Sequence, residues 1–260
     1  MITFTGLQIE HFMALFMFAS LRVFGLFLTA PFFAFRAFPM QFRLLIALAF
    51  SFYLMPLVGS EAIPDPGSIT FLASILELSL GAFIGFVVRV GFMVIDIAAE
   101  LLSFQSGFSF ASSYVRDHNL DSGLVGQFLG LVTLALAFTL NVHLVLIDVV
   151  LQSFKSIPVG VWPQAWTSRG IVNLVSASFH LGLVLSMPIF MVYMMFNLTQ
   201  AFLGRTSPQM NLFSVGFAVS IPLAFLVLFM ILPDLQNILE RSLENPMQII
   251  RQGMEAPLAR

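Results

Sequence analysis

The fold class is decided by residues 75–95, which read ILELSLGAFIGFVVRVGFMVI. The run is nearly all apolar, and it is about as long as the roughly 20 helical residues that cross a bilayer core. Apolar residues follow one another without the alternation of a half-buried strand. The stretch therefore predicts a membrane helix. Its two charged residues, Glu77 and Arg89, need partners in protein or in water.

The composition of the whole chain agrees with this stretch. Of its 260 residues 59% are hydrophobic and 9% are charged, whereas a soluble domain has about 25% charged residues. So few charges exclude a soluble globular enzyme. A net charge of −2 offers no basic surface for nucleic acid. The absence of cysteine removes disulfides and thiolate metal sites. We therefore expect an all-α, membrane-associated protein that does not bind nucleic acid.

Breaks rich in proline, glycine and arginine separate six apolar blocks along the chain. The blocks are 12–35, 44–58, 69–95, 124–151, 171–198 and 212–232. The second block is short for a span. The widest gap, residues 96–123, is long enough that an irregular connection there would more often be functional than idle. Residues 234–260 form a polar tail of mixed charge, which we expect to be helical over part of its length.

Two tests separate a free-standing bundle of spans from a subunit of a larger assembly. Alternate threading of the blocks puts four Lys or Arg residues on one side and five on the other, so no positive-inside signal orients the chain. Charged or titratable residues also lie within the blocks: Arg22, Glu77, Arg89, His143, Asp148 and His180. A charge at the membrane centre costs about 2.5–3.5 kcal/mol on insertion scales. We infer that these helices face other protein over most of their surface.

The charges inside the blocks have two interpretations. Glu77 and Arg89 lie about three helical turns apart, too far to pair with each other on one straight helix. They could line a proton or ion path, but we favour salt bridges between subunits. His143 and Asp148 are five residues apart and lack the i, i+4 spacing of a helical metal site. No metal or other cofactor is predicted.

Small residues and methionines recur at helical spacing. The small pairs Gly81/Gly85, Gly126/Gly130 and Ser178/Gly182 predict close contacts between helix backbones. The methionines are Met187, Met191, Met194 and Met195. A deformable seal around a moving polymer would suit them, but we favour packing in the core.

Residues 104–114, FQSGFSFASSY, differ in kind from the apolar blocks. Aromatic side chains are interspersed with small residues, and Gly107 interrupts a helix. This composition suits a plug that seals a channel and moves aside, and it suits an interfacial loop with aromatic anchors equally well. The sequence contains no GxSxG, P-loop or HExxH motif. We therefore expect no enzymatic activity.

Three motifs in order resemble one family of proteins. They are PFFAFRAFP at residues 31–39, QSGFSFA at 105–111 followed by Asn141-Val142-His143-Leu144, and RTSPQMNLFSVGF at 205–217. At this chain length they resemble the FliR/SctT family, which belongs to the export gate of type III secretion systems. The resemblance covers about residues 12–234, and the 105–111 motif favours the flagellar branch.

The resemblance implies a core subunit of a protein export gate in the bacterial inner membrane, at the basal body of a flagellum or an injectisome. Such a subunit packs kinked helical hairpins against FliP-like and FliQ-like subunits in a hetero-oligomer, and lipid is a minor neighbour. An FlhB-like protein docks on this assembly, and unfolded export substrates pass through its pore. Residues 1–123 would be FliP-like and include a plug loop at about 102–121. Residues 124–233 would be FliQ-like in their latter half, and 234–260 the polar tail.

The candidate residues form three sets. Plug or gate contacts are expected from Phe104, Gln105, Gly107, Phe108, Phe110 and Tyr114. Polar contacts between subunits are expected from Arg36, Arg43, Glu77 and Arg89. A turn between the last two apolar helices is expected at Pro208, Gln209, Met210 and Asn211. The alternative function is a free-standing secondary transporter or channel for small solutes, which would need a midplane site between broken helices.

Overall fold

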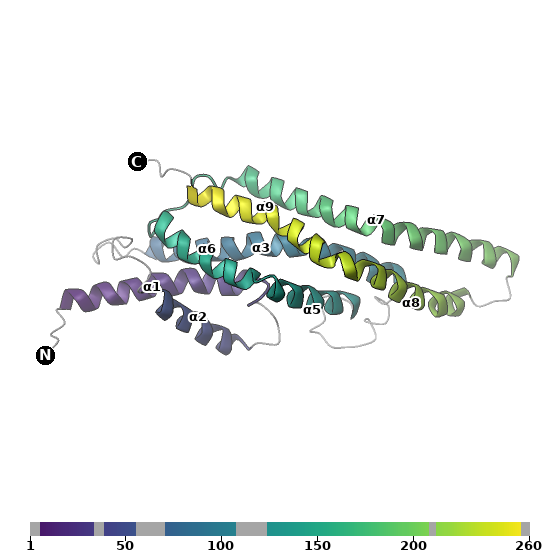
Figure 1. Ribbon diagram of the computed structural model, residues 1–260, viewed down its shortest axis with the longest axis horizontal. Helices are drawn as coiled ribbons and strands as arrows, with labels where there is room; N and C mark the ends of the chain where they lie inside the picture. Colours follow the sequence, from purple (N-terminus) through teal and green to yellow (C-terminus); the bar gives the residue numbers. More distant parts are fainter. Residues whose placement is uncertain (1–5, 34–38, 56–70, 108–123, 208–211, 256–260) are drawn as a thin grey trace. The chain divides into compact units, whose positions relative to one another are not determined.

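The computed structural model describes residues 6–33, 39–55, 71–107, 124–207 and 212–255, and these contain helices and turns but no strand (Figure 1). The helices are α1 (Gly6–Thr29), α2 (Met40–Leu54), α3 (Phe71–Ser106), α5 (Leu124–Thr139), α6 (Val142–Ser156), α7 (Ser168–Thr206), α8 (Leu212–Ile231), the 3-10 turn η4 (Leu232–Asp234) and α9 (Leu235–Glu255). The predicted all-α fold class is confirmed.

Four stretches of the described residues are long and apolar enough to cross a membrane. They are Phe12–Thr29, Phe71–Ser106, Ser168–Thr206 and Val215–Glu255. Helices α5 and α6 make a fifth if the pair is counted as one bent span. Helix α2 has 15 residues and falls short of a span, as the sequence predicted.

Helix α3 runs beyond its apolar block and ends only at Ser106. Its extension alternates exposed Asp96 and Glu100 with buried Ala99 and Leu102, so it keeps an apolar stripe at helical spacing. The polar residues made this part look like a connection between helices. The helix stops where expected, because Gly107 has a φ of 81°, in the left-handed region.

The fourth apolar block is broken, although it contains no proline. Asn141 has a φ of 56° and separates α5 from α6. Its N–H donates to the Phe138 carbonyl at 3.0 Å, and its own carbonyl accepts from Leu144 N–H at 2.9 Å. Asparagine tolerates left-handed backbone better than most residues. The break between α5 and α6 is therefore made by one asparagine, a residue type that adopts left-handed backbone.

The chain divides into two compact units, each built from separate stretches. Unit 1 comprises Met1–Val90, Phe138–Asn173 and Glu244–Arg260, and unit 2 comprises Gly91–Ala137 and Leu174–Leu243. The predicted division at residues 123 and 233 concerns similarity to other subunits, and it stays a prediction.

In unit 1, glycines let α1 and α3 approach backbone to backbone. A Cβ added at Gly81 would lie 2.7 Å from the Arg22 carbonyl carbon, and one at Gly85 would lie 2.8 Å from Ala30 N. Thr29 Oγ1 also donates to the Ala82 carbonyl at 2.9 Å across the same contact. The close packing predicted from Gly81 and Gly85 is confirmed.

In unit 2, the buried face of α7 includes three small residues, Ser178, Gly182 and Ser186, beside the larger Leu174, Ile189 and Tyr193. A Cβ at Gly182 would lie 2.9 Å from Ile97 Cδ1, so the pair Ser178/Gly182 marks a close contact with α3 as predicted. Gly130 on α5 is different, since an added Cβ would meet nothing within 4 Å among the described residues. The close contact expected at this pair is therefore absent at Gly130.

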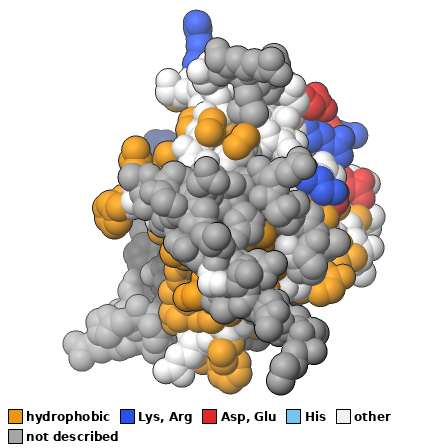
Figure 2. Space-filling view, turned by 90° about the vertical axis from the view of Figure 1, so that its left-hand side faces the viewer, with side chains coloured by type: hydrophobic (Ala, Val, Ile, Leu, Met, Phe, Trp, Pro, Cys, Tyr) orange, Lys and Arg blue, Asp and Glu red, His pale blue; other side chains and the backbone are white. Residues whose placement is uncertain are grey.

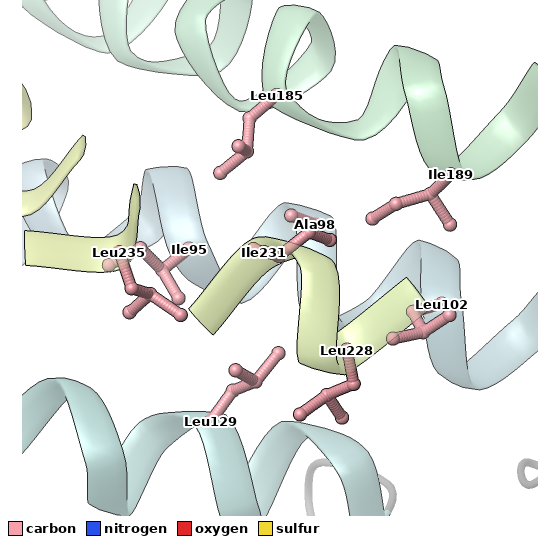
Figure 3. A pocket seen from close by; sticks show the side chains of 9 residues that line it. All are labelled: Ile95, Ala98, Leu102, Leu129, Leu185, Ile189, Leu228, Ile231 and Leu235. Atoms are coloured by element: carbon pink, nitrogen blue, oxygen red, sulfur yellow. The ribbon is translucent and has the colours of Figure 1, made fainter. Parts of the chain in front are cut away.

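The core of unit 2 is closely filled. Figure 3 shows nine apolar side chains from α3, α5, α7, α8 and α9 around one small cavity, namely Ile95, Ala98, Leu102, Leu129, Leu185, Ile189, Leu228, Ile231 and Leu235. The cavity holds about 10 Å³, the size of a single water. Because its lining is wholly apolar, we expect it to be dry.

Much of the remaining surface of α7 is apolar and exposed. Met187, Met191, Met194 and Met195 are 52%, 65%, 53% and 68% exposed, so the prediction that these methionines pack in the core is wrong. Hydrophobic side chains are also visible at the surface in Figure 2. Monomeric soluble proteins rarely show large apolar patches, which mark interfaces with protein or membrane.

Candidate functional site

Unit 1 buries a charged pair between α1 and α3. Arg22 and Glu77 both have fully buried side chains, and Arg22 Nε donates to Glu77 Oε2 at 2.6 Å. The guanidinium also donates from Nη1 to Ser153 Oγ at 3.1 Å and from Nη2 to the Ile157 carbonyl at 3.5 Å. Its carbon Cζ lies 4.1 Å from the centre of the Phe154 ring. The positive charge is thus held by an anion, two neutral acceptors and an aromatic face.

The turn after α6 completes this cluster. Gly160 has a φ of 80°, and its N–H donates to Glu77 Oε1 at 3.0 Å. An added Cβ there would lie 3.3 Å from Ala73 Cβ, so the turn passes close to α3. The pair therefore joins three stretches of unit 1 that are distant in sequence. Buried pairs are weak evidence for stability, but the loss of one partner is strongly destabilising.

These contacts differ from the sequence-based expectation for Glu77. We expected its partner on another subunit, and the structure gives it Arg22 of the same chain. Arg43 is half-buried on α2 and Arg89 is exposed on α3, while Arg36 lies outside the described residues. Contacts of these three arginines with other subunits stay predictions. Arg22 was absent from the candidate set, although a charge within an apolar block is itself a signal.

His143 and Asp148 are not brought together into a site. The His143 ring lies 4.9 Å from that of Phe138 and 6.5 Å from that of Phe32, measured between centroids. Asp148 is exposed and accepts a hydrogen bond from Gln152 Nε2 at 2.6 Å. No group of three His, Cys, Asp or Glu residues in the described ranges could hold a metal ion.

In unit 2, hydrogen bonds fix the C-terminal end of α3. The Ser106 carbonyl accepts from Ser220 Oγ at 2.9 Å, and the Ser220 carbonyl accepts from Tyr193 Oη at 2.9 Å. The next residue, Gly107, packs so closely on Phe217 that an added Cβ would lie 3.2 Å from its Cδ1. The point at which the chain leaves α3 is therefore held by α7 and α8.

Half of the predicted plug set lies at this end of α3. Phe104 is 68% exposed, Gln105 is half-buried, and Gly107 ends the helix. Phe108, Phe110 and Tyr114 fall outside the described residues, as does the predicted turn Pro208, Gln209, Met210 and Asn211. Their roles stay predictions.

Two adjoining hollows open beside this end of α3. The larger, of about 320 Å³, is lined by Phe104, Gln105, Ser106, Gly107, Phe196, Asn197, Gln200, Gly216, Phe217 and Ser220. The smaller, of about 270 Å³, is lined by Gln105, Phe190, Met194, Asn197 and Leu198. They share Gln105 and Asn197, and we name them together the amide groove. The residues predicted from the sequence do not include Asn197 and Gln200. Two amide side chains about one turn apart in an apolar helix are the pattern that could have identified them.

Comparison with known proteins identifies the family. The model of the bacterial export proteins, family 1, matches residues 13–245. The chain belongs to this family. The resemblance to the FliR/SctT family that the three motifs suggested is thereby confirmed, and the flagellar branch is favoured.

Several curated relatives of this bacterial export protein carry the name flagellar biosynthetic protein FliR. The one from Buchnera aphidicola subsp. Acyrthosiphon pisum is 27% identical over 246 residues, covering 94% of this chain and 95% of the relative. The one from Caulobacter vibrioides is 30% identical over 210 residues, covering 80% and 84%. The one from Escherichia coli K12 is 25% identical over 236 residues, covering 90% of each. The protein is thus a membrane component of a type III export apparatus.

Proposed function

We propose that the protein is a core subunit of the flagellar export gate in the inner membrane. It forms and closes the channel through which unfolded export substrates pass, and it catalyses no covalent chemistry. Its partners are FliP-like and FliQ-like subunits, with an FlhB-like protein docked on the assembly. Family membership supports this role.

The observation that carries the proposal is the unequal burial of two long apolar helices. Within the most apolar part of each, 67% of α3 residues are buried but only 22% of α7 residues. Helix α3 is therefore an internal helix of the chain, whereas α7 leaves most of its surface for something else to cover. A channel built with neighbouring subunits covers such a helix, and charged groups enclosed within the chain, such as Arg22 and Glu77, do not interfere with that contact.

The gating part of the proposal concerns residues 102–121, with Phe104, Phe108, Phe110 and Tyr114 as sealing contacts. Support comes from the end of α3, where Ser106 is fixed by Ser220 while Phe104 remains exposed. A fixed starting point and an exposed aromatic side chain suit a segment that closes a channel. Lipid, by comparison, is a minor neighbour in this arrangement.

Deletion of residues 107–113 tests the gating role. We expect ion leakage across the inner membrane to rise while the subunits still co-purify, because the seal is lost and the helices remain. In cells that lack the FliP-like subunit, the same deletion should leak no more than background, since no gate assembles. Unchanged leakage from an intact assembly would contradict the gating role.

Purification in mild detergent tests the assembly. FliP-like and FliQ-like subunits should co-purify with the chain, and the chain expressed alone should aggregate or be degraded because α7 is uncovered. A monodisperse, folded monomer would contradict the proposal. Solute uptake by vesicles containing this chain alone would favour the alternative, a free-standing transporter.

A further inference from the structure

The segment between α6 and α7, residues 157–167, contains both tryptophans of the chain, and we name it the tryptophan turn. It belongs to unit 1. The ring centroids of Trp162 and Trp166 are 5.7 Å apart, and they lie 5.5 Å and 4.5 Å from that of Phe83 on α3. Trp166 is buried, whereas Trp162 is half-buried. Aromatic contacts therefore fix the turn against α3.

The tryptophan turn joins two stretches that are apolar enough to cross a membrane, α7 and the bent pair of α5 and α6. A connection between two such stretches lies where the chain leaves the hydrocarbon core. The C-terminal half of α9 packs there too, because Trp166 Nε1 donates to the Ile249 carbonyl at 3.1 Å. This half exposes Glu244, Gln248 and Arg251, which avoid hydrocarbon. Tryptophan itself is enriched at the level of lipid headgroups, so these features are those of a segment at the membrane surface.

Two cations and an indole N–H beside the turn have no acceptor in the chain. Lys155, in the last turn of α6, and Arg169, in the first turn of α7, are both exposed. Neither makes an ion pair or hydrogen bond in the part of the chain that the structure describes. The Trp162 indole N–H also makes no hydrogen bond with a described residue, and it is not enclosed. Residues 149–171 contain no Asp or Glu, so the turn carries a local positive charge.

The chemistry of these groups selects a phosphate with an apolar part. Arg169 stands at the end of a helix where the dipole disfavours a cation, so its own helix does not stabilise it. Phosphate oxygens accept well from ammonium, guanidinium and N–H donors. Val161, which is 40% exposed, and exposed Pro158 add an apolar surface that a free phosphate leaves uncovered. At a membrane surface the anions already present are phospholipid headgroups, whose acyl chains cover such a surface.

We propose that the tryptophan turn binds the headgroup of an anionic phospholipid, with Lys155 and Arg169 at its phosphate and Trp162 at the level of the headgroups. The site goes beyond the export function and does not depend on it, because it requires only that the chain lies in a membrane. The contact is confined to one turn, so the apolar helices remain open to other subunits. It fixes the height of unit 1 in the bilayer.

Site-specific photocrosslinking in the assembled apparatus tests this site. A photoreactive residue replaces Val161, and the assembly is reconstituted into vesicles of phosphatidylcholine with a minor share of phosphatidylglycerol. Position 184 on the open face of α7 is the matched control, since Val184 is 53% exposed and Val161 is 40% exposed. We expect the lipid captured at position 161 to be enriched in phosphatidylglycerol relative to the vesicle. No enrichment is expected at position 184.

Charge substitutions measure the share of each cation in this preference. A Lys or Arg near an anionic surface corresponds to about a fivefold change in affinity, so Lys155→Gln and Arg169→Gln should each lower the enrichment by about that factor. Arg205→Gln is the control, because Arg205 is an exposed arginine in the last turn of the same helix as Arg169. Lys155→Arg with Arg169→Lys keeps both charges and should keep the enrichment.

The other outcomes overturn the proposal. Capture of a neighbouring subunit alone at position 161 would make the turn a protein contact. Equal enrichment at positions 161 and 184, or full enrichment in Lys155→Gln with Arg169→Gln, would show that the cations select no lipid. Loss of capture in excess inorganic phosphate would make the turn a site for free phosphate, because a bound phospholipid is held by its acyl chains as well.

Discussion

The two units of the protein treat their polar groups in opposite ways. In unit 1, the most polar group, Arg22, is fully buried and meets Glu77, Ser153 and the Ile157 carbonyl of the same chain. In unit 2, Gln105, Asn197 and Gln200 line an open groove without hydrogen bonds to other described residues. Apolar residues show a similar contrast, since unit 1 packs glycine-rich backbones together while α7 exposes four methionines.

We call unit 1, whose buried charges bond within the chain, the framework, and the open face of unit 2 the contact surface. A group satisfied inside the chain holds the chain together and has little left to offer a partner. A polar group left open to water keeps its hydrogen-bonding capacity for a partner. In unit 1 the charged pair Arg22 and Glu77 is enclosed, whereas in unit 2 the uncharged amides of Gln105, Asn197 and Gln200 line an open groove.

The largest expected effect comes from opening the enclosed pair. Glu77→Leu leaves the Arg22 guanidinium buried without its anion, which should destabilise the folded chain by about 3–5 kcal/mol. The double variant Arg22→Met with Glu77→Leu removes both charges and should recover much of that loss. The thermal midpoint of the purified assembly measures both. If the double variant were no more stable than Glu77→Leu, the loss in Glu77→Leu would not come from the unpaired charge of Arg22 between α1 and α3.

A smaller effect is expected from separating the backbones of unit 1. Gly81→Ala places a methyl group against the backbone of Arg22 and Leu26, so α1 and α3 must move apart at a cost of about 1–3 kcal/mol. Gly130→Ala is the matched control, since it meets nothing within 4 Å and improves helix propensity by up to about 1 kcal/mol. The same melting measurement compares them. Equal effects of the two substitutions would show that backbone proximity is unimportant here.

The hydrogen bond from Ser220 to the end of α3 should respond more weakly. Ser220→Ala removes the donor to the Ser106 carbonyl, and the loss should be about 1 kcal/mol. Thr206→Val is a control, because that hydroxyl is exposed and donates only within its own turn of α7. Hydrogen exchange of the last turn of α3 should rise for Ser220→Ala alone. Unchanged exchange would mean that Ser220 does not fix this end of the helix.

The smallest effect on stability is expected at Gly216. The methyl group of Gly216→Ala displaces the flexible end of Gln200, so stability should change by less than about 0.5 kcal/mol. The thermal midpoint of the purified assembly measures this. A loss as large as that expected for Gly81→Ala would show that the Gln200 side chain does not move aside.

Local sequence patterns predicted the helices but not their limits. Uninterrupted apolar runs and glycine spacing at Gly81 and Gly85 identify membrane helices and a close contact from neighbouring residues alone. The extension of α3 past Asp96 was missed because a polar residue on an exposed helix face looks, in sequence, like a connection. The break at Asn141 was missed because one left-handed residue leaves no apolar gap.

The candidate sites depended on contacts between distant residues, which a single sequence does not show. Arg22 and Glu77 stand in different apolar blocks, and only the packing of α1 on α3 reveals that they pair within the chain. The motif at 105–111 pointed to Gln105, yet Asn197 and Gln200 attracted no attention among apolar neighbours. Both sites form where helices pack together, and the composition of the chain does not show which helices pack together.

The positions of the two tryptophans give the protein a built-in optical probe. Trp162 and Trp166 both belong to unit 1, where Trp166 Nε1 donates to the Ile249 carbonyl at 3.1 Å and its ring lies 4.5 Å from that of Phe83. Unit 2 contains no tryptophan. In the purified assembly, the tryptophan fluorescence of this chain therefore reports the melting of one unit only, while circular dichroism reports both. A difference between the two melting curves would show whether the framework outlasts the contact surface on heating.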